Sequence, residues 1–175
     1  MKYGPFIFLA LLVSASAAWA QDVEFSGYYT ISPMANHNFV IDVAGASTAN
    51  DARVQLYTRH NGINQDFAVI PNGKGNYWII CRLSGKALDV AGGSPNDKTP
   101  IVQFRAHGSD NQLWMIQKQP NGYFLIVNVA SRKVLDAAGF QDPANQNDGV
   151  QIQQYTRNDG PNQFWSFTPS QGTAQ

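Results

Sequence analysis

The stretch Ala87-Leu88-Asp89-Val90-Ala91-Gly92 is one of three copies of a short pattern in this chain. The pattern also occurs upstream as Phe39-Val40-Ile41-Asp42-Val43-Ala44-Gly45 and downstream as Val134-Leu135-Asp136-Ala137-Ala138-Gly139. Its aspartates stand at positions 42, 89 and 136, so both intervals are 47 residues long. A fixed period of about 20 to 50 residues is typical of chains built from repeated structural units.

Two further landmarks follow each aspartate. The nearer landmark ends in an aromatic residue and reads Val54-Gln55-Leu56-Tyr57, Ile101-Val102-Gln103-Phe104 and Ile152-Gln153-Gln154-Tyr155. The farther one reads Asn64-Gln65-Asp66-Phe67, Asn111-Gln112-Leu113-Trp114 and Asn162-Gln163-Phe164-Trp165. The Gln of the farther landmark follows the aspartate by 23, 23 and 27 residues. The extra four residues fall in the polar stretch Gln141–Asp148, where an insertion into a surface loop costs little.

Each copy contains four short apolar runs separated by Gly, Pro, Asn and Asp. Several runs alternate apolar and polar residues, as half-buried strands do, and no stretch of a dozen residues has a helical period. Four strands in each of three copies predict an all-β domain of about twelve strands. One unit cannot bury its apolar face alone, so we expect the three units to close on one another, which also removes exposed sheet edges.

The first twenty residues have the pattern of a secretory signal peptide. Lys2 precedes a short apolar run over 6–13, and Ala18-Trp19-Ala20 forms a small-residue cleavage site before Gln21. The run is shorter than the about 20 apolar residues that cross a bilayer. We therefore expect a secreted protein, extracellular or periplasmic, without a membrane span. The expected organisation is a signal peptide at 1–20 and one domain at 21–175, with repeats at about 28–74, 75–121 and 122–169.

The composition excludes several classes of protein. The 175 residues include 12 Lys and Arg and 12 Asp and Glu, so the formal net charge is zero, and 15 Asn and 15 Gln outnumber the charged side chains. A nucleic-acid binder needs clustered basic residues, and a disordered chain has low hydrophobicity and high net charge. Cys81 is the only cysteine, which excludes an internal disulfide and a zinc site with two or more cysteine ligands.

The threefold combination of Leu-Asp-Val-Ala-Gly, Val-Gln-x-Tyr and Asn-Gln-x-Trp resembles the ricin B-type lectins, the carbohydrate-binding β-trefoils. The resemblance extends from about Tyr28 to Phe167, which is nearly all of the chain after the signal peptide. It implies a β-trefoil, with six strands in a short barrel and six in a hairpin cap, related by pseudo-threefold symmetry.

The resemblance also implies one sugar pocket in each copy. An aspartate accepts hydrogen bonds from sugar hydroxyls, amides both donate and accept, and an aromatic ring can lie against a sugar C–H face. The matching residues are Asp42, Gln55, Tyr57, Asn64 and Gln65 in the first copy, Asp136, Gln153, Tyr155, Asn162 and Gln163 in the third, and Asp89, Phe104, Asn111 and Gln112 in the second.

The second copy departs from this pattern at one position. Val102 stands where the first copy has Gln55, and Gln103, one residue along a strand, should face the other way. We therefore expect the second pocket to lack one hydrogen bond.

The same residue types also have structural interpretations, which the sequence leaves open. The aspartates could cap turns, the tyrosines could pack inward, and the glutamines could tie loops to the backbone. We expect the Phe or Trp of each Gln-x-Trp motif to lie in the core. Phe67, which replaces Trp in the first copy, then changes core volume and not pocket chemistry.

No motif indicates catalysis, a metal or a cofactor. His60 and His107 are 47 residues apart, as equivalent repeat positions are, and Asn158 holds the third position. Such duplicated histidines suit pocket rims or loop packing better than a single catalytic base. Glu24 is the only glutamate, and paired carboxylates for glycoside cleavage are not indicated. The Asn/Asp-rich stretch Asn145–Gly149 lacks the closing glutamate of a calcium loop.

The sequence thus predicts a secreted, non-catalytic lectin for galactose-type or related glycans, with xylan-type polysaccharide as a close competitor. Two alternatives remain open. The chain could be the targeting subunit of a separate toxin or polysaccharide hydrolase. It could also be a trefoil module that binds or inhibits a protein.

Overall fold

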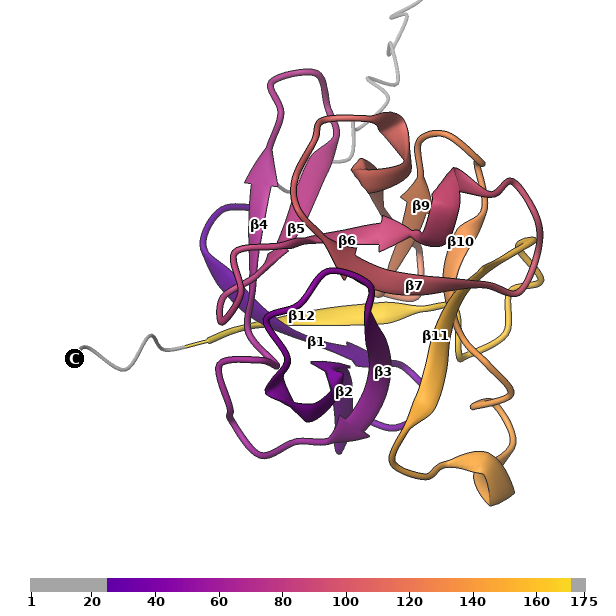
Figure 1. Ribbon diagram of the computed structural model, residues 1–175. Coiled ribbons are helices and arrows are strands. Elements are labelled where there is room, and N and C mark those ends of the chain that lie inside the picture. The colour runs from indigo at the N-terminus through magenta and orange to yellow at the C-terminus, as the bar shows by residue number, and fades with distance from the viewer. Residues whose placement is uncertain (1–24, 171–175) are drawn as a thin grey trace, which may run out of the picture.

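The computed structural model describes residues 25–170, so the predicted signal peptide at 1–20 lies outside the described residues (Figure 1). Within this range the chain forms twelve β-strands and four short 3-10 helices. The strands are β1 (Tyr28–Pro33), β2 (Phe39–Val43), β3 (Ala52–Thr58), β4 (Phe67–Pro71), β5 (Tyr77–Cys81), β6 (Ala87–Val90), β7 (Thr99–Phe104), β8 (Trp114–Lys118), β9 (Phe124–Asn128), β10 (Val134–Ala137), β11 (Val150–Tyr155) and β12 (Trp165–Pro169). The 3-10 helices are η1 (Ala44–Ala46), η2 (Ala91–Gly93), η3 (Asp110–Gln112) and η4 (Pro143–Asn145). The predicted all-β fold of about twelve strands is confirmed.

Six strands form a closed barrel. Strand β1 pairs with β4 and β12, β5 pairs with β4 and β8, and β9 pairs with β8 and β12, all antiparallel. Each strand of this ring therefore has a partner on both sides, which removes the exposed edges that an open sheet would present.

The other six strands form three hairpins, β2–β3, β6–β7 and β10–β11. The second strands of these hairpins also pair with one another, β3 with β7, β7 with β11 and β11 with β3 (Figure 1). The hairpins therefore meet in a triangle that relates the three copies. This barrel with its hairpin cap is the β-trefoil architecture that the resemblance implies.

The Gln-x-Trp aromatics lie in the core, as expected. Phe67, Trp114 and Trp165 are fully buried. Trp114 donates its indole N–H to the carbonyl of Leu88 at 3.3 Å, and Trp165 makes the equivalent bond to Leu135 at 3.1 Å. Phe67 has no such donor, so the first copy differs from the others in core packing.

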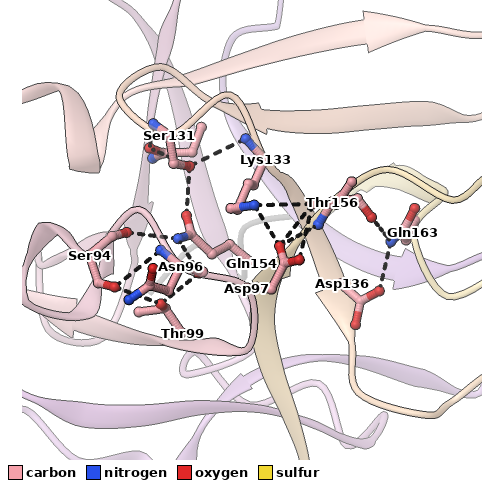
Figure 2. A network of polar contacts seen from close by, with 11 residues as sticks. Ser94, Asn96, Asp97, Thr99, Ser131, Lys133, Asp136, Gln154, Thr156 and Gln163 are labelled. Carbon is pink, nitrogen blue, oxygen red and sulfur yellow. Dashed lines mark hydrogen bonds and ion pairs between the residues drawn. The ribbon is translucent and has the colours of Figure 1, made fainter.

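Buried glutamines tie one copy to the next. Gln154 donates its amide to the carbonyls of Ser94 and Asn96 at 2.7 and 2.8 Å, and accepts from the Ser131 hydroxyl at 2.7 Å (Figure 2). Gln103 repeats the arrangement one copy earlier, with the carbonyls of Ser47 and Ala49 as acceptors. Gln103 therefore faces away from Asp89, as the sequence predicts.

Cys81 is buried and makes no disulfide. Among the helices at 25–170, none is long and apolar enough to cross a membrane.

Candidate functional site

Each repeated aspartate occupies the same place, on the first strand of a cap hairpin. Asp42 lies on β2, Asp89 on β6 and Asp136 on β10, and none is more than 4% exposed. Each strand ends one residue later, and the chain turns through a glycine in the left-handed conformation that favours glycine. These glycines have φ angles of 62°, 62° and 68° at Gly45, Gly92 and Gly139.

In the first copy, three amides hold the aspartate. Gln55 lies directly opposite Asp42 in the hairpin and donates to its Oδ1 at 3.1 Å. Asn64 and Gln65 donate to the other oxygen, Oδ2, at 2.8 and 3.1 Å. Within residues 25–170 the hydrogen bonds to the Asp42 carboxylate come from these side-chain amides, and none comes from a backbone N–H of the following turn. The turn-capping interpretation of Asp42 is therefore wrong.

The third copy has the same arrangement. Gln153 lies opposite Asp136 and donates to its Oδ1 at 2.8 Å. Asn162 and Gln163 donate to Oδ2, each at 2.9 Å. The three amide side chains that the sequence assigns around the aspartate are therefore brought together in both copies.

The second copy lacks part of this network. Val102 lies opposite Asp89, so no amide reaches the carboxylate from the neighbouring strand. Gln112 donates to Asp89 Oδ2 at 2.7 Å, whereas Asn111 donates to the carbonyl of Val90 at 3.4 Å. The hydrogen bond that Val102 removes is missing, as the sequence predicts.

The glutamine of each Gln-x-Trp motif lies behind the aspartate. Gln65, Gln112 and Gln163 are fully buried. Each side-chain amide N–H group also donates to a backbone carbonyl at or just after the end of the third strand of its copy, which is β3, β7 or β11. Each side-chain amide oxygen accepts from a backbone N–H in the loop that follows. The carbonyls are those of Thr58, Arg105 and Thr156, and the N–H groups are those of His60, His107 and Asn158. These glutamines position the carboxylate and also tie loops to the backbone.

Aromatic and imidazole rings form one wall of the first two sites. Tyr57 is 38% exposed, so the interpretation that it packs inward is wrong. The His60 ring meets it edge to face, 6.0 Å between centroids, and His60 Nε2 lies 3.4 Å from Asp42 Oδ2. Phe104 and His107 repeat this geometry, with His107 Nε2 3.4 Å from Asp89 Oδ2. The histidines are rim residues, as their loop positions suggest.

An open hollow lies beside each aspartate. The hollows of the first, second and third copies have volumes of about 350, 380 and 220 Å³. Each is lined by its aspartate, by the aromatic residue of the third strand and by the Asn that precedes Gln-x-Trp. The sequence assigned those residues, and it suggested rim positions for His60 and His107, whose equivalent in the third copy is Asn158. It missed three other polar wall residues, namely Asp51, Lys98 and Gln141.

Repeat spacing explains why the sequence suggested rim positions for two of the wall residues and missed two others. His60 and His107 are separated by 47 residues, the interval that separates the aspartates. Asp51 and Lys98 have the same interval but differ in charge, so repetition of residue type does not mark them.

Burial shapes the electrostatics of two of the carboxyls. Desolvation raises the pKa of Asp136 above its usual range, against the lowering effect of Gln153, Gln163 and Asn162. Desolvation likewise raises the pKa of Asp89, against Gln112 and the nearby His107. Over residues 25–170 there is no group of three or more His, Cys, Asp or Glu side chains that could hold a metal ion.

Comparison with known proteins gives one family and a set of similar structures. A family model described as ricin-type beta-trefoil lectin domain-like matches residues 15–104, 81–146 and 110–175. No curated protein matches the chain in sequence.

Three solved structures illustrate the similarity. The designed threefold symmetric protein ThreeFoil is 33% identical with a TM-score of 0.78, over 82% of this chain and 99% of that one. An exo-beta-1,3-galactanase from Clostridium thermocellum is 27% identical with a TM-score of 0.76, over 82% of this chain and 30% of the enzyme. The Macrolepiota procera ricin B-like lectin, in complex with lactose, is 23% identical with a TM-score of 0.71, over 85% of this chain and 99% of the lectin.

Proposed function

This chain belongs to the ricin-type β-trefoil lectin domain-like family, and from that premise we propose that it is a secreted, non-catalytic lectin that binds galactose-type glycans. The family membership agrees with the resemblance that the three repeats indicate. Secretion rests on the signal-peptide pattern at 1–20, and the preference for galactose rests on the resemblance.

The observation that carries the proposal is the unused hydrogen-bonding capacity of a fixed carboxylate beside an exposed ring. A carboxylate offers about four lone-pair sites. Asp42 accepts one hydrogen bond on Oδ1 and two on Oδ2 from residues in the described range, which leaves one site on Oδ1 for a ligand. Tyr57 offers an exposed ring next to that oxygen's hollow. A sugar presents hydroxyls and a C–H face, which are complementary to these two groups.

The amides make this geometry rigid before a ligand arrives. Asp136 is held at both oxygens by Gln153, Asn162 and Gln163, so its remaining acceptor direction is fixed by side chains that are already hydrogen bonded. Preorganisation of this kind lowers the entropy that binding would otherwise cost.

Each pocket should nevertheless bind weakly. A shallow site with one charge-assisted hydrogen bond and one ring contact gives about −4 kcal/mol, or a Kd near 1 mM. Two or three pockets on one chain would then act through avidity on a surface or a polymer that carries many copies of the sugar.

A glycan array tests the proposal. We expect the protein to bind galactose-terminated or related glycans, and the double variant Asp42→Asn/Asp136→Asn to lose most of that binding. Asp110→Asn/Asp159→Asn is the matched control, because it makes the same change of charge at exposed residues outside the hollows. If the first variant binds as well as the protein itself, the site assignment is wrong. If the folded protein binds no glycan, the lectin proposal fails.

One observation favours a second function, the targeting of a separate enzyme. The chain aligns with 30% of the length of an exo-beta-1,3-galactanase at 27% identity, so a similar domain is part of a larger polysaccharide hydrolase there. A partner of this kind would co-purify with the protein from the medium as a second secreted polypeptide. Hydrolysis of galactan by the purified chain alone would contradict the non-catalytic proposal.

A further inference from the structure

Each hollow has one neighbour from the preceding copy of the repeat. The backbone N–H groups of Asp51, Lys98 and Gly149 donate to carbonyls on the third strand of the next copy, each at 2.9 Å. The acceptors are Gln103, Gln154 and Leu56. Asp51 thereby lines the second hollow and Lys98 lines the third. A Cβ on Gly149 would lie 3.8 Å from Gln55 in the first.

The backbone fixes these three positions without help from their side chains. All three have a left-handed conformation, with φ of 61° at Asp51, 63° at Lys98 and 85° at Gly149. Glycine adopts this conformation without strain, whereas a lysine does not. Gly149 of the third copy shows that a glycine can occupy this position in the fold. The fold therefore does not require the Lys98 side chain.

The Lys98 ammonium is available to a ligand. Lys98 is exposed, and its side chain makes no ion pair or hydrogen bond with any residue of the described range 25–170. The neighbouring Lys133 is different, because its Nζ lies 2.6 Å from Asp97 Oδ1 (Figure 2). Asp136, the one acidic residue that lines this hollow, is buried and already accepts three amide hydrogen bonds.

The same position has the opposite charge in the second hollow. Asp51 and Asp89 both line it, so two carboxyl groups face one space. Beside the first hollow this position is Gly149, which has no side chain. The three hollows share the aspartate and an aromatic ring of the third strand, but this position is glycine in the first copy, Asp51 in the second and Lys98 in the third. The first two hollows also have a histidine where the third has Asn158.

We propose that the third hollow selects an anionic sugar, one that carries a carboxylate or a sulfate beside its ring hydroxyls, with the Lys98 ammonium as the partner of that group. This inference rests on the proposed lectin function and names the ligand class of one of its pockets. Asp51 disfavours the same ligands in the second hollow, because its exposed carboxylate repels an anionic group there.

NMR titration of the ¹⁵N-labelled protein at low salt tests the inference, with amide signals of Gln153 and Tyr155 reporting on the third hollow. The probes are galactose, galacturonic acid and galactose 6-sulfate. We expect an anionic sugar to bind the third hollow about two- to fivefold more tightly than galactose, as an exposed ion pair contributes. The preference should shrink as salt is added. If only galacturonic acid is preferred, the hollow selects a carboxylate, and if only galactose 6-sulfate is preferred, it selects a sulfate. If both are preferred over galactose, the hollow selects negative charge.

Variants separate this inference from the proposed function. Lys98→Gln should abolish the preference for anionic sugars in the third hollow. Lys74→Gln makes the same change of charge in the exposed β4–β5 turn and should keep both the preference and galactose binding. Asp51→Lys should create the preference in the second hollow. If galactose binds but the anions are not preferred, or Lys98→Gln keeps the preference, the inference is wrong. If no probe binds, the proposed function itself fails.

Discussion

Val102 lies directly across the β6–β7 hairpin from Asp89, in the place where Gln55 and Gln153 donate to the aspartates of the other two copies. The residue opposite the aspartate therefore decides whether an amide donates to the carboxylate from the neighbouring strand. Asp89 has one amide donor on Oδ2, whereas Asp42 and Asp136 each have three in total.

The substitution Val102→Gln should restore the missing donor. A hydrogen bond to an ionised carboxyl favours the charged form, so the pKa of Asp89 should fall. The added bond should stabilise the folded protein by about 1 kcal/mol. The reverse change, Gln153→Val, should raise the pKa of Asp136. NMR titration of the two carboxyl groups measures both shifts, and shifts of the opposite sign would show that the opposite strand does not set the charge state.

The buried glutamines should matter more for stability than for the shape of the hollow. Gln163→Leu removes donors to Asp136 and to the Thr156 carbonyl, and it leaves the Asn158 N–H without its acceptor. Loss of partners at buried polar groups should lower the free energy of unfolding by about 2–4 kcal/mol. Gln117→Leu, on the exposed part of β8, is the control and should change it by less than about 0.5 kcal/mol. Urea unfolding distinguishes them, and equal effects would mean that Gln163 does not hold the carboxylate.

Tyr57 should matter more for glycan binding than for the stability of the fold. Its ring is partly exposed, so Tyr57→Ala should cost little stability while glycan binding at the first hollow falls about three- to tenfold, as the loss of one ring contact implies. Tyr57→Phe keeps the ring and should keep most of the affinity. NMR titration of the first-hollow amides tests this pair, and full affinity in Tyr57→Ala would exclude stacking on this ring.

Buried Asp136 gives a pH dependence of definite sign. Its pKa is raised in the folded state above the unfolded value of about 3.9, so it favours folding most below about pH 4 and this contribution is lost as pH rises through the folded pKa. The unfolding free energy of the protein minus that of Asp136→Asn should therefore fall with rising pH over this window. Asp97, whose pKa a hydrogen bond from Lys133 lowers, titrates in both proteins and largely cancels in the difference. A difference that rises with pH would mean that Asp136 is stabilised in its charged form.

The sequence could predict what repetition of residue type makes visible. The aspartates, the third-strand aromatics and the Asn-Gln pairs recur at matched spacing, and the structure brings them together once in each copy. The position of Gln103 followed from strand alternation, because adjacent residues of a strand face opposite sides.

The remaining features depend on how the copies pack. Lys98 reaches the third hollow only because its N–H pairs with the Gln154 carbonyl of the next copy, and no pattern within one repeat encodes that contact. The bond of Gln154 to the Ser94 carbonyl is likewise made between copies. The sequence also could not separate wall residues from the buried glutamines behind them, because both types lie beside the aspartate in the pattern.

The central claim is that the hollow beside Asp42 binds a sugar, and an NMR titration with galactose tests it most directly. We predict that galactose shifts the amide signals of Asp42, Gly45, Tyr57, His60 and Asn64 together, with one saturation curve near 1 mM, and that Asp42→Asn removes these shifts. Shifts confined to other surfaces of the molecule, such as the separate hollow between Arg59 and Arg82, would contradict the account.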